Sequence, residues 1–296
     1  MSRQFSYRGL FVCLALGAAA FGLACGGGGN KGSNEAPATR SFPPDSTMER
    51  LLQNGKITIG VKFDVPLFGL LDSVTRKPDG FDVAVGKEIA KELGLREDQI
   101  QFVEAISGNR IPYLQEDKVD LIISTMTITD ARKQQIDFSI PYYVAGQSIL
   151  VLKENRSIHS VGDLNGQSVC SGQASTSEAT LQSKAPQAKL LSLQVYSACI
   201  SAMKDGRVDA VSTDDIILAG LASVDKDLKL VGEQFTKEFY GVGIKKGDGD
   251  LVTFVNDVLA GMMRDGRWER IYKKYLGSVQ GLPSASEAKA RLLGPS

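Results

Sequence analysis

The chain of 296 residues has a single histidine, His159, and its four cysteines include no Cys-x-x-Cys pair. Because most protein zinc sites are built from clusters of histidine and cysteine, these shortages argue against a bound metal, and we expect no other cofactor. Neither charge predominates: Lys plus Arg and Asp plus Glu are 34 each, and no basic run carries interleaved aromatic residues. The sequence therefore lacks the features of a nucleic-acid-binding protein.

Long apolar runs are missing too, except at the start of the chain. Leu10–Ala24 follows two arginines, is short for a membrane span of about 20 residues, and ends in small residues, which is typical of an export signal. The ending Leu23-Ala24-Cys25-Gly26 resembles a bacterial lipobox, and the resemblance implies cleavage before Cys25 and a lipid on its thiol. We therefore expect residues 1–24 to be a lipoprotein signal peptide; an ordinary signal peptide is the alternative.

Residues 25–45 have no apolar periodicity and many glycines and prolines, which predicts a lipidated cysteine followed by a flexible tether. We expect the protein to lie outside the cytoplasm, anchored to the cell membrane at Cys25. Cys170 and Cys199 remain after the two amino-terminal cysteines. In an exported chain, a disulfide between them is favoured over two buried thiols.

The rest of the chain alternates short β-branched strands with amphipathic helices, which is typical of an α/β protein. Lys56–Phe63 and Val208–Thr213 are two of the predicted strands, and Phe81–Leu93 and Leu251–Asp265 are two of the predicted helices. At this length the chain can form two hydrophobic cores. Residues 281–296 are expected to be a mobile carboxyl-terminal tail.

One segment, Asp120–Gln147, places polar side chains just after a predicted buried strand. Thr125, Thr127 and Thr129 alternate along an extended backbone, so we expect their hydroxyls on one side. Arg132 follows in a short predicted helix, and its planar guanidinium suits a carboxylate. Ligands bind open α/β sheets at the carboxyl ends of strands, although an arginine taken alone is more often solvated.

A second segment, Arg207–Asp214, repeats the pattern of Lys118–Thr125: Val-Asp, an apolar strand and hydroxyl side chains follow a predicted helix. Two such units facing each other would bring both strand ends to one cleft. Asp214 either binds a cation there or caps the following helix. Because Asp215 can cap instead, we favour the first interpretation.

Two further helix starts carry candidate anion-binding groups. Pro112 fits only the first turn of a helix, which makes Asn109 the expected cap and Arg110 the first helical residue. A cation there opposes the helix dipole, which a functional anion nearby would offset; an arginine folded back to solvent is the alternative. Ser175 and Glu178 predict another helix start, whose exposed N–H groups favour anions.

Several ordered motifs between Lys56 and Leu276 resemble the family 3 extracellular solute-binding proteins of amino-acid ABC transporters. They are Gly80-Phe-Asp-Val-Ala-Val, the segment 119–132, Asp137-Phe-Ser-Ile-Pro-Tyr-Tyr and Asp209-Ala-Val-Ser-Thr-Asp. Within the family, the chain is most similar to glutamate/glutamine-binding lipoproteins of actinobacterial type.

The resemblance implies an α/β, two-lobed periplasmic-binding-protein-like fold of type II, each lobe a mixed sheet flanked by helices. Lobe 1 would contain residues 46–143 and 239–280, and lobe 2 residues 144–238. Two strands that cross between the lobes, near residues 142–148 and 235–240, would form the hinge.

The resemblance also implies how the cleft binds a free amino acid. Arg132 pairs with the α-carboxylate, helped by the Thr127 hydroxyl, by backbone N–H groups near Thr125 and Thr127, and by Ser175 and Thr176 from lobe 2. Asp214 binds the α-ammonium together with the Thr125 carbonyl. Phe68 or Phe63 packs on the aliphatic part of the ligand, unless it belongs to the core.

The side chain of the ligand would meet Lys62, Ser107 and Arg110, on loops that the family places near its distal end. Two cations favour a second carboxylate, and thus glutamate or aspartate, because an amide leaves one cation unpaired at a cost of about 1–3 kcal/mol. Glutamine or asparagine would fit if Asp64 or Glu104 neutralises one cation.

We therefore expect a lipid-anchored, monomeric binding component that closes on an amino acid and delivers it to the transmembrane subunits of an ABC permease. An enzyme such as a periplasmic dehydratase would need an acid or base in the cleft, and His159 lies in a surface-like connector. A sensor domain is a further alternative, which the missing second membrane span argues against.

Overall fold

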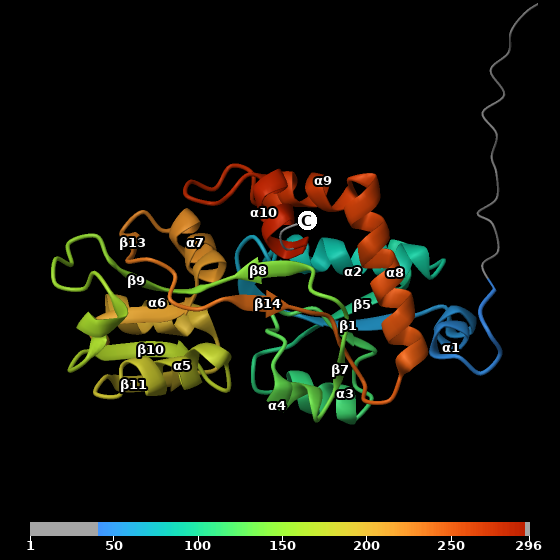
Figure 1. Cartoon of the computed structure of the whole chain (residues 1–296), viewed down its shortest axis with the longest axis horizontal. Coiled ribbons are helices and arrows are strands. Elements are labelled where there is room, and N and C mark those ends of the chain that lie inside the picture. Colours follow the sequence, from blue (N-terminus) through green and yellow to red (C-terminus); the bar gives the residue numbers. More distant parts are fainter. Residues whose placement is uncertain (1–40, 294–296) are drawn as a thin grey trace, which may run out of the picture. The chain divides into compact units, whose positions relative to one another are not determined.

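The computed structural model describes residues 41–293, which fold into two α/β lobes linked by crossing strands (Figure 1). The predicted signal peptide, Cys25 and most of the tether lie outside the described residues. In the part of the chain that the structure describes, no helix is both long and apolar enough to cross a membrane. Each lobe contains a mixed sheet with helices around it, which confirms the predicted fold class.

Lobe 1 is built on a five-stranded sheet with strand order β5-β1-β6-β15-β7, in which β1 pairs in parallel with β5 and β6. A small antiparallel sheet of β2, β3 and β4 follows β1 in the chain. The strands are β1 (Ile57–Val61), β2 (Asp64–Val65), β3 (Gly69–Leu71), β4 (Pro78–Asp79), β5 (Ile100–Glu104), β6 (Leu121–Ile122), β7 (Asp137–Phe138) and β15 (Gly243–Ile244). The helices are α1 (Thr47–Asn54), α2 (Phe81–Glu92), α3 (Arg110–Gln115), α4 (Asp130–Lys133), α8 (Gly249–Asp265) and α9 (Arg267–Tyr275), with a 3-10 turn at Glu97–Gln99.

Lobe 2 has a second five-stranded sheet, with strand order β11-β10-β12-β9-β13. Its strands are β9 (Gln147–Leu152), β10 (Ser168–Gly172), β11 (Lys189–Leu193), β12 (Ala210–Asp214) and β13 (Leu228–Val231). Its helices are α5 (Thr176–Lys184), α6 (Tyr196–Lys204) and α7 (Asp215–Val224), with a 3-10 turn at Val161–Leu164. Cys170 in β10 is bonded to Cys199 in α6, with their Cα atoms 5.5 Å apart, so the disulfide fastens α6 to the sheet.

The two lobes are connected by β8 (Tyr143–Ala145) and β14 (Glu238–Tyr240), which form a separate antiparallel pair. The chain enters lobe 2 through β8 and returns through β14 (Figure 1). These strands lie within the two segments where the sequence predicted the crossing. That they bend as a hinge stays a prediction.

An aromatic cluster fills the space between the start of α2, the crossing strands and α9. Phe68 is fully buried, and its ring centroid lies 5.3 Å from that of Phe81 and 5.1 Å from that of Tyr143. Trp268 Nε1 donates to the Tyr142 carbonyl at 2.8 Å. The structure therefore places Phe68 in the core, the alternative that the sequence left open, and not on an open cleft wall.

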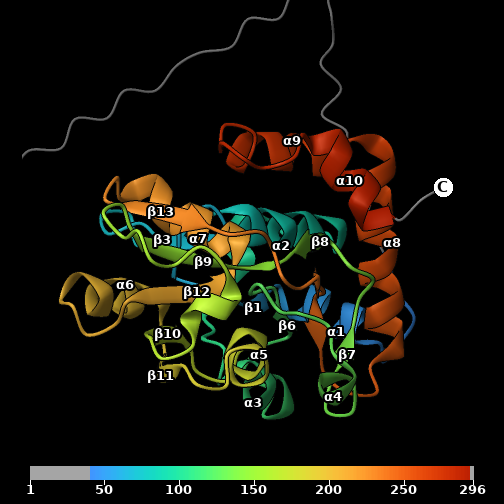
Figure 2. The ribbon, with the colours of Figure 1, turned by 60° about the vertical axis from the view of Figure 1, so that its left-hand side comes forward.

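The part of the carboxyl-terminal segment that the structure describes, residues 281–293, is folded and is not a mobile tail. Ala285–Leu293 form helix α10, which packs against α9 and β8 (Figure 2). The Tyr272 hydroxyl donates to the Pro283 carbonyl at 2.8 Å, and Lys289 Nζ donates to the Met263 carbonyl at 2.6 Å. The sequence prediction was wrong because one short helix gives a weak periodic signal, and tertiary contacts decide whether it forms.

Candidate functional site

The polar residues singled out in the sequence come together from both lobes. Thr127 and Arg132 lie in the loop after β6 and in α4 of lobe 1, whereas Thr176 begins α5 and Asp214 ends β12 in lobe 2. The hydroxyl oxygens of Thr127 and Thr176 are 3.4 Å apart. The two lobes are thus in contact at the predicted site.

Arg132 is held against the loop that precedes it. Thr129 caps α4 by accepting from the Arg132 backbone N–H at 3.2 Å, and Arg132 Nη1 donates to the Thr127 carbonyl at 2.8 Å. Burial lowers the pKa of the guanidinium, and the charge of Asp214 works in the opposite direction. Arg132 is therefore not the solvated surface residue that its type alone suggests, and a carboxylate from the other lobe lies within electrostatic reach.

Asp214 occupies the N-cap position of α7, but its side chain does not cap the helix. The Tyr240 hydroxyl donates to Asp214 Oδ2 at 2.5 Å, and Oδ1 is buried without a hydrogen-bond partner. Burial, followed by the charge of Glu238, raises the pKa of Asp214 to about 7. The neighbouring Asp215, the first residue of α7, accepts from the Gly146 N–H at 3.1 Å. The capping alternative for Asp214 is wrong, and one of its oxygens can still accept from a buried donor.

The backbone of Thr125 makes its hydrogen bonds within lobe 1, in the loop that follows β6. It turns the chain at a φ of 43°, so the predicted alternation of the three threonine hydroxyls is broken there. Its N–H donates to Asp82 Oδ2 at 2.8 Å, and its carbonyl accepts from Arg110 Nη1 at 3.1 Å. The Thr125 N–H is therefore already bound to Asp82, and it is not one of the free donors expected near Thr125 and Thr127. The carbonyl keeps a second lone pair for an ammonium group.

Arg110 begins α3 after Asn109, as Pro112 predicted. The side chain turns inward, is 2% exposed, and donates to the backbone carbonyls of Ser107, Ser124 and Thr125 at 3.3, 2.9 and 3.1 Å. Burial, and then the charge of Arg132, lowers its pKa. The alternative of an arginine folded back to solvent is wrong: Arg110 is a buried cation held by carbonyl dipoles.

Lys62 lies next to Arg110, directly after β1, and is 1% exposed. Its Nζ donates to Ser107 Oγ at 3.1 Å and lies 5.6 Å from the ring centroid of Tyr196. Burial, and then the charge of Arg110, lowers the pKa of Lys62 to about 7, whereas Asp64 and Glu104 oppose the shift. Lys62, Ser107 and Arg110 are called the cationic corner below.

Ser175 and Thr176 open α5 as the sequence predicted. Ser175 Oγ accepts from the Glu178 N–H at 3.1 Å, and the Glu178 carboxylate accepts from the Ala174 N–H at 2.7 Å. The cap uses the Ser175 oxygen as an acceptor, and the Ser175 hydroxyl also hydrogen-bonds to Tyr196. Thr127 in lobe 1 and the start of α5 in lobe 2 thus face each other across the site.

Sequence reasoning missed two aromatic residues at this site. Tyr240 holds Asp214, and Tyr196, which starts α6, is buried with its hydroxyl accepting from Thr213 at 3.0 Å. A Cβ placed on Gly172 would lie 2.8 Å from the Tyr196 ring, so only glycine allows that close approach. One aromatic residue at an element end leaves no periodic pattern, and no sequence signal separated these two from ordinary core residues.

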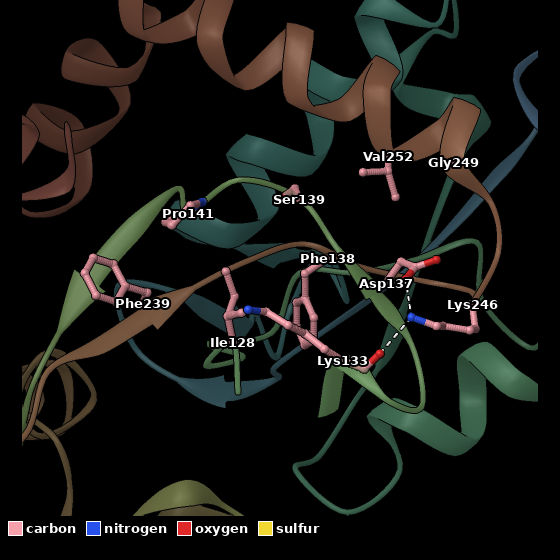
Figure 3. A pocket seen from close by; sticks show the side chains of 10 residues that line it. All are labelled: Ile128, Lys133, Asp137, Phe138, Ser139, Pro141, Phe239, Lys246, Gly249 and Val252. Atoms are coloured by element: carbon pink, nitrogen blue, oxygen red, sulfur yellow. Dashed lines mark hydrogen bonds and ion pairs between the residues drawn. The ribbon is translucent and has the colours of Figure 1, made fainter. Parts of the chain in front are cut away.

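A separate pocket of about 770 Å³ opens on lobe 1, beside α8, β7 and β14 (Figure 3). Lys246 crosses its edge and donates to Asp137 at 2.7 Å and to the Lys133 carbonyl at 2.8 Å. None of the predicted site residues lines this pocket. Within residues 41–293, histidine, cysteine and carboxylate side chains form no group of three or more that could hold a metal ion.

This arrangement, with charged groups from two lobes meeting at strand ends, matches a known class of protein. Residues 57–278 fit the family described as bacterial extracellular solute-binding proteins, family 3. The chain belongs to this family.

Three similar proteins have names that state what they bind. The ABC transporter glutamine-binding protein GlnH of Bacillus subtilis is 42% identical over 84% of this chain and 90% of its own length. The glutamate-binding protein GluB of Corynebacterium glutamicum is 33% identical over 76% of this chain and 80% of its own. A solved ancestral arginine-binding protein bound to glutamine superimposes with a TM-score of 0.70 at 39% identity, covering 76% of this chain and 99% of that one.

Proposed function

We propose that this protein captures a free amino acid between its two lobes and delivers it to an ABC permease. The observation that carries the proposal is a half-buried arginine, Arg132, within electrostatic reach of Asp214, whose Oδ1 is buried and unpartnered. An α-amino acid carries a carboxylate and an ammonium a few ångströms apart. Charge-assisted hydrogen bonds to both groups in a closed cleft are of the strong kind.

The groups around this pair supply the remaining bonds. Thr127, Ser175 and Thr176 donate hydroxyls to the ligand carboxylate, and the Thr125 carbonyl accepts from the ammonium beside Asp214. Because these residues come from both lobes, the full set forms only when the lobes are closed. The crossing strands β8 and β14 are the proposed hinge.

The cationic corner favours glutamate or aspartate as the ligand. Lys62 has one hydrogen-bond partner, Ser107, and a pKa lowered to about 7 by burial and by Arg110. A ligand carboxylate here would pair with the ammonium and restore its charge, whereas the carbonyl oxygen of an amide gives a weaker bond. We therefore propose an acidic amino acid as the preferred ligand.

Glutamine is the second candidate, and two observations favour it. Asp64 and Glu104 both act on Lys62 and offset part of the positive charge. The Bacillus subtilis relative, at 42% identity, is named a glutamine-binding protein. A half-neutral lysine with a pKa of about 7 can also serve an amide oxygen.

The anchoring and the partner belong to the same proposal. A lipid on Cys25 and the tether of residues 25–45 would keep the monomer at the outer surface of the cell membrane, next to the permease. The name of the Bacillus subtilis relative, an ABC transporter binding protein, supports the permease as partner. We propose no catalytic reaction for the cleft.

Calorimetric titration of the purified chain from residue 41 onward against each common amino acid tests the proposal. We expect binding of glutamate or aspartate, with glutamine and asparagine weaker. Tighter binding of glutamine would select the second candidate. The absence of heat and of thermal stabilisation with every amino acid would refute amino-acid capture.

A further inference from the structure

Helix α6 of lobe 2 begins without a cap from its own lobe. Its N-cap residue is Val195, which has extended backbone angles and makes no side-chain cap hydrogen bond. The first N–H groups of a helix have no partner within the helix and need one from elsewhere. In α5, by comparison, Ser175 supplies that partner locally.

Lobe 1 supplies the partner that α6 lacks. Asp64 Oδ2, in β2, accepts from the Tyr196 N–H at 2.7 Å and from the Ser197 N–H at 3.4 Å. Asp64 Oδ1 is buried without a partner, so the carboxylate is largely withdrawn from water. A carboxylate at a helix start is bound both by the N–H groups and by the helix dipole.

The loop that carries Asp64 is fixed to lobe 1 on its other side. The N–H groups of Phe81 and Asp82, at the start of α2, donate to the carbonyls of Leu67 and Phe68 at 2.7 and 3.1 Å. The same loop touches a second lobe 2 helix, because a Cβ on Gly220 in α7 would lie 2.4 Å from the Pro66 carbonyl oxygen. Because the hydrogen bonds to the start of α2 hold this loop on lobe 1, separation of the lobes would pull Asp64 away from α6.

We propose that Asp64 is a latch between the lobes: it caps α6 only when the cleft is closed, and it thereby lengthens the time for which the ligand is held. Asp64 is a positioning residue, since it acts through the lobe contact and not through the ligand. The latch rests on the proposed function, because holding time is defined only for a protein that closes on a ligand.

Replacement of Asp64 should weaken binding mainly by speeding dissociation. Loss of a helix cap is worth about 0.5–2 kcal/mol, so Asp64→Ala should raise Kd about 2- to 30-fold. We expect the increase in koff, with kon within about twofold, because opening of the closed form becomes easier. Asp64→Asn keeps an oxygen that caps helices nearly as well and should stay within about threefold of the wild type.

A local cap in lobe 2 provides the matched control. Val195→Ser places a capping hydroxyl at the N-cap of α6 in both the open and the closed state. In that background, Asp64→Ala should change Kd by less than about twofold, since neighbouring substitutions that share one function are not additive. Asp64 also raises the pKa of Lys62, so its removal also acts on an acidic ligand through Lys62. Glutamate and neutral glutamine are therefore titrated in parallel. Loss of the latch should weaken the binding of both ligands equally.

Hydrogen exchange of the ligand-bound protein provides a second readout. The Tyr196 and Ser197 amides should exchange faster in the Asp64→Ala variant, and the added Val195→Ser cap should restore protection to the first turn. Unchanged exchange at both amides, or an equal loss of affinity with and without the Val195→Ser cap, overturns the latch. If the wild type binds no amino acid, the proposed function fails and the latch fails with it; if the wild type binds and the Asp64→Ala variant changes neither koff nor exchange, the latch alone fails.

Discussion

The hydroxyl oxygen of Thr127 in lobe 1 lies 3.4 Å from that of Thr176 in lobe 2. This contact joins the loop that leads to Arg132 to the first turn of α5, so the candidate anion-binding groups of the two lobes face one another. Each lobe alone contributes an incomplete set, because Arg132 comes from one and the α5 start from the other. The proposed site is therefore a property of the closed arrangement.

Arg132→Ala should weaken the binding of any amino acid by more than about 30-fold, because removal of one partner of a buried charge pair costs about 2–5 kcal/mol. Arg132→Lys keeps the charge but loses the planar fork and should recover only part of the affinity. The exposed Arg156, which donates to the Lys153 carbonyl, provides the matched control as Arg156→Ala. Affinities measured by calorimetry that are equal for the Arg132→Ala and Arg156→Ala variants would remove Arg132 from the site.

Lys62→Met should discriminate between the two candidate ligands. Methionine fills the same buried space without the ammonium, so a ligand carboxylate loses a charged partner and glutamate should bind about 30- to 100-fold more weakly. Glutamine loses one ordinary hydrogen bond, worth about fivefold or less. Lys153→Met, at an exposed position, is the control. Equal losses for both ligands would show that Lys62 does not read the ligand side chain.

The pH dependence of binding should differ in shape between glutamate and glutamine. Asp214 must be ionised to take the ammonium, and its pKa is raised to about 7, so affinity for both ligands falls as the pH drops below 7. Lys62 must be protonated to pair with a second carboxylate, and its pKa is lowered to about 7, so affinity for glutamate alone also falls as the pH rises above 7. On the acidic limb below pH 7 and on the alkaline limb above it, the affinity changes by at most about tenfold per pH unit.

Titrations between pH 5 and pH 9 test this pair of profiles. The expected result is a maximum near pH 7 for glutamate and a plateau above pH 7 for glutamine. The Lys62→Met variant should lose the alkaline limb for glutamate and keep the acidic limb. Parallel profiles for the two ligands in the wild type would contradict the roles given to Lys62.

The sequence alone was a good guide where a pattern is local. Periodicity located α2 and α8 to within two residues at each end, and Pro112 set the start of α3 at Arg110. In each of these cases the residues that determine the structure are neighbours in the chain.

Local patterns were a poor guide where a distant residue decides. Thr125 takes a positive φ because Asp82, far back in the chain, holds its N–H and Arg110 holds its carbonyl. Helix α10 depends on contacts with α9 and β8. The cap on α6 comes from Asp64 in the other lobe, so the sequence around Val195 carries no trace of it.

Asp82→Asn should change the pH dependence of folding stability, because Asp82 is a fully buried carboxyl. Its two oxygens accept from the Thr125 N–H and the Tyr142 hydroxyl, each at 2.8 Å, but burial outweighs these bonds and raises its pKa from 3.8 to about 7. A raised pKa stabilises the fold while the group is protonated. That stabilisation is complete below about pH 4 and is lost as the pH rises through 7.

Asparagine at this position carries no charge at any pH and can satisfy the same two partners by accepting from the Thr125 N–H and donating to the Tyr142 oxygen. The free energy of unfolding of the Asp82→Asn variant, relative to the wild type, should therefore increase by about 2–4 kcal/mol between pH 4 and pH 7. Urea unfolding at several pH values measures the difference, and Asp214 titrates equally in both proteins and cancels. A difference that stays constant over this range would mean that Asp82 is ionised throughout, with its charge balanced by Lys62 and Arg110.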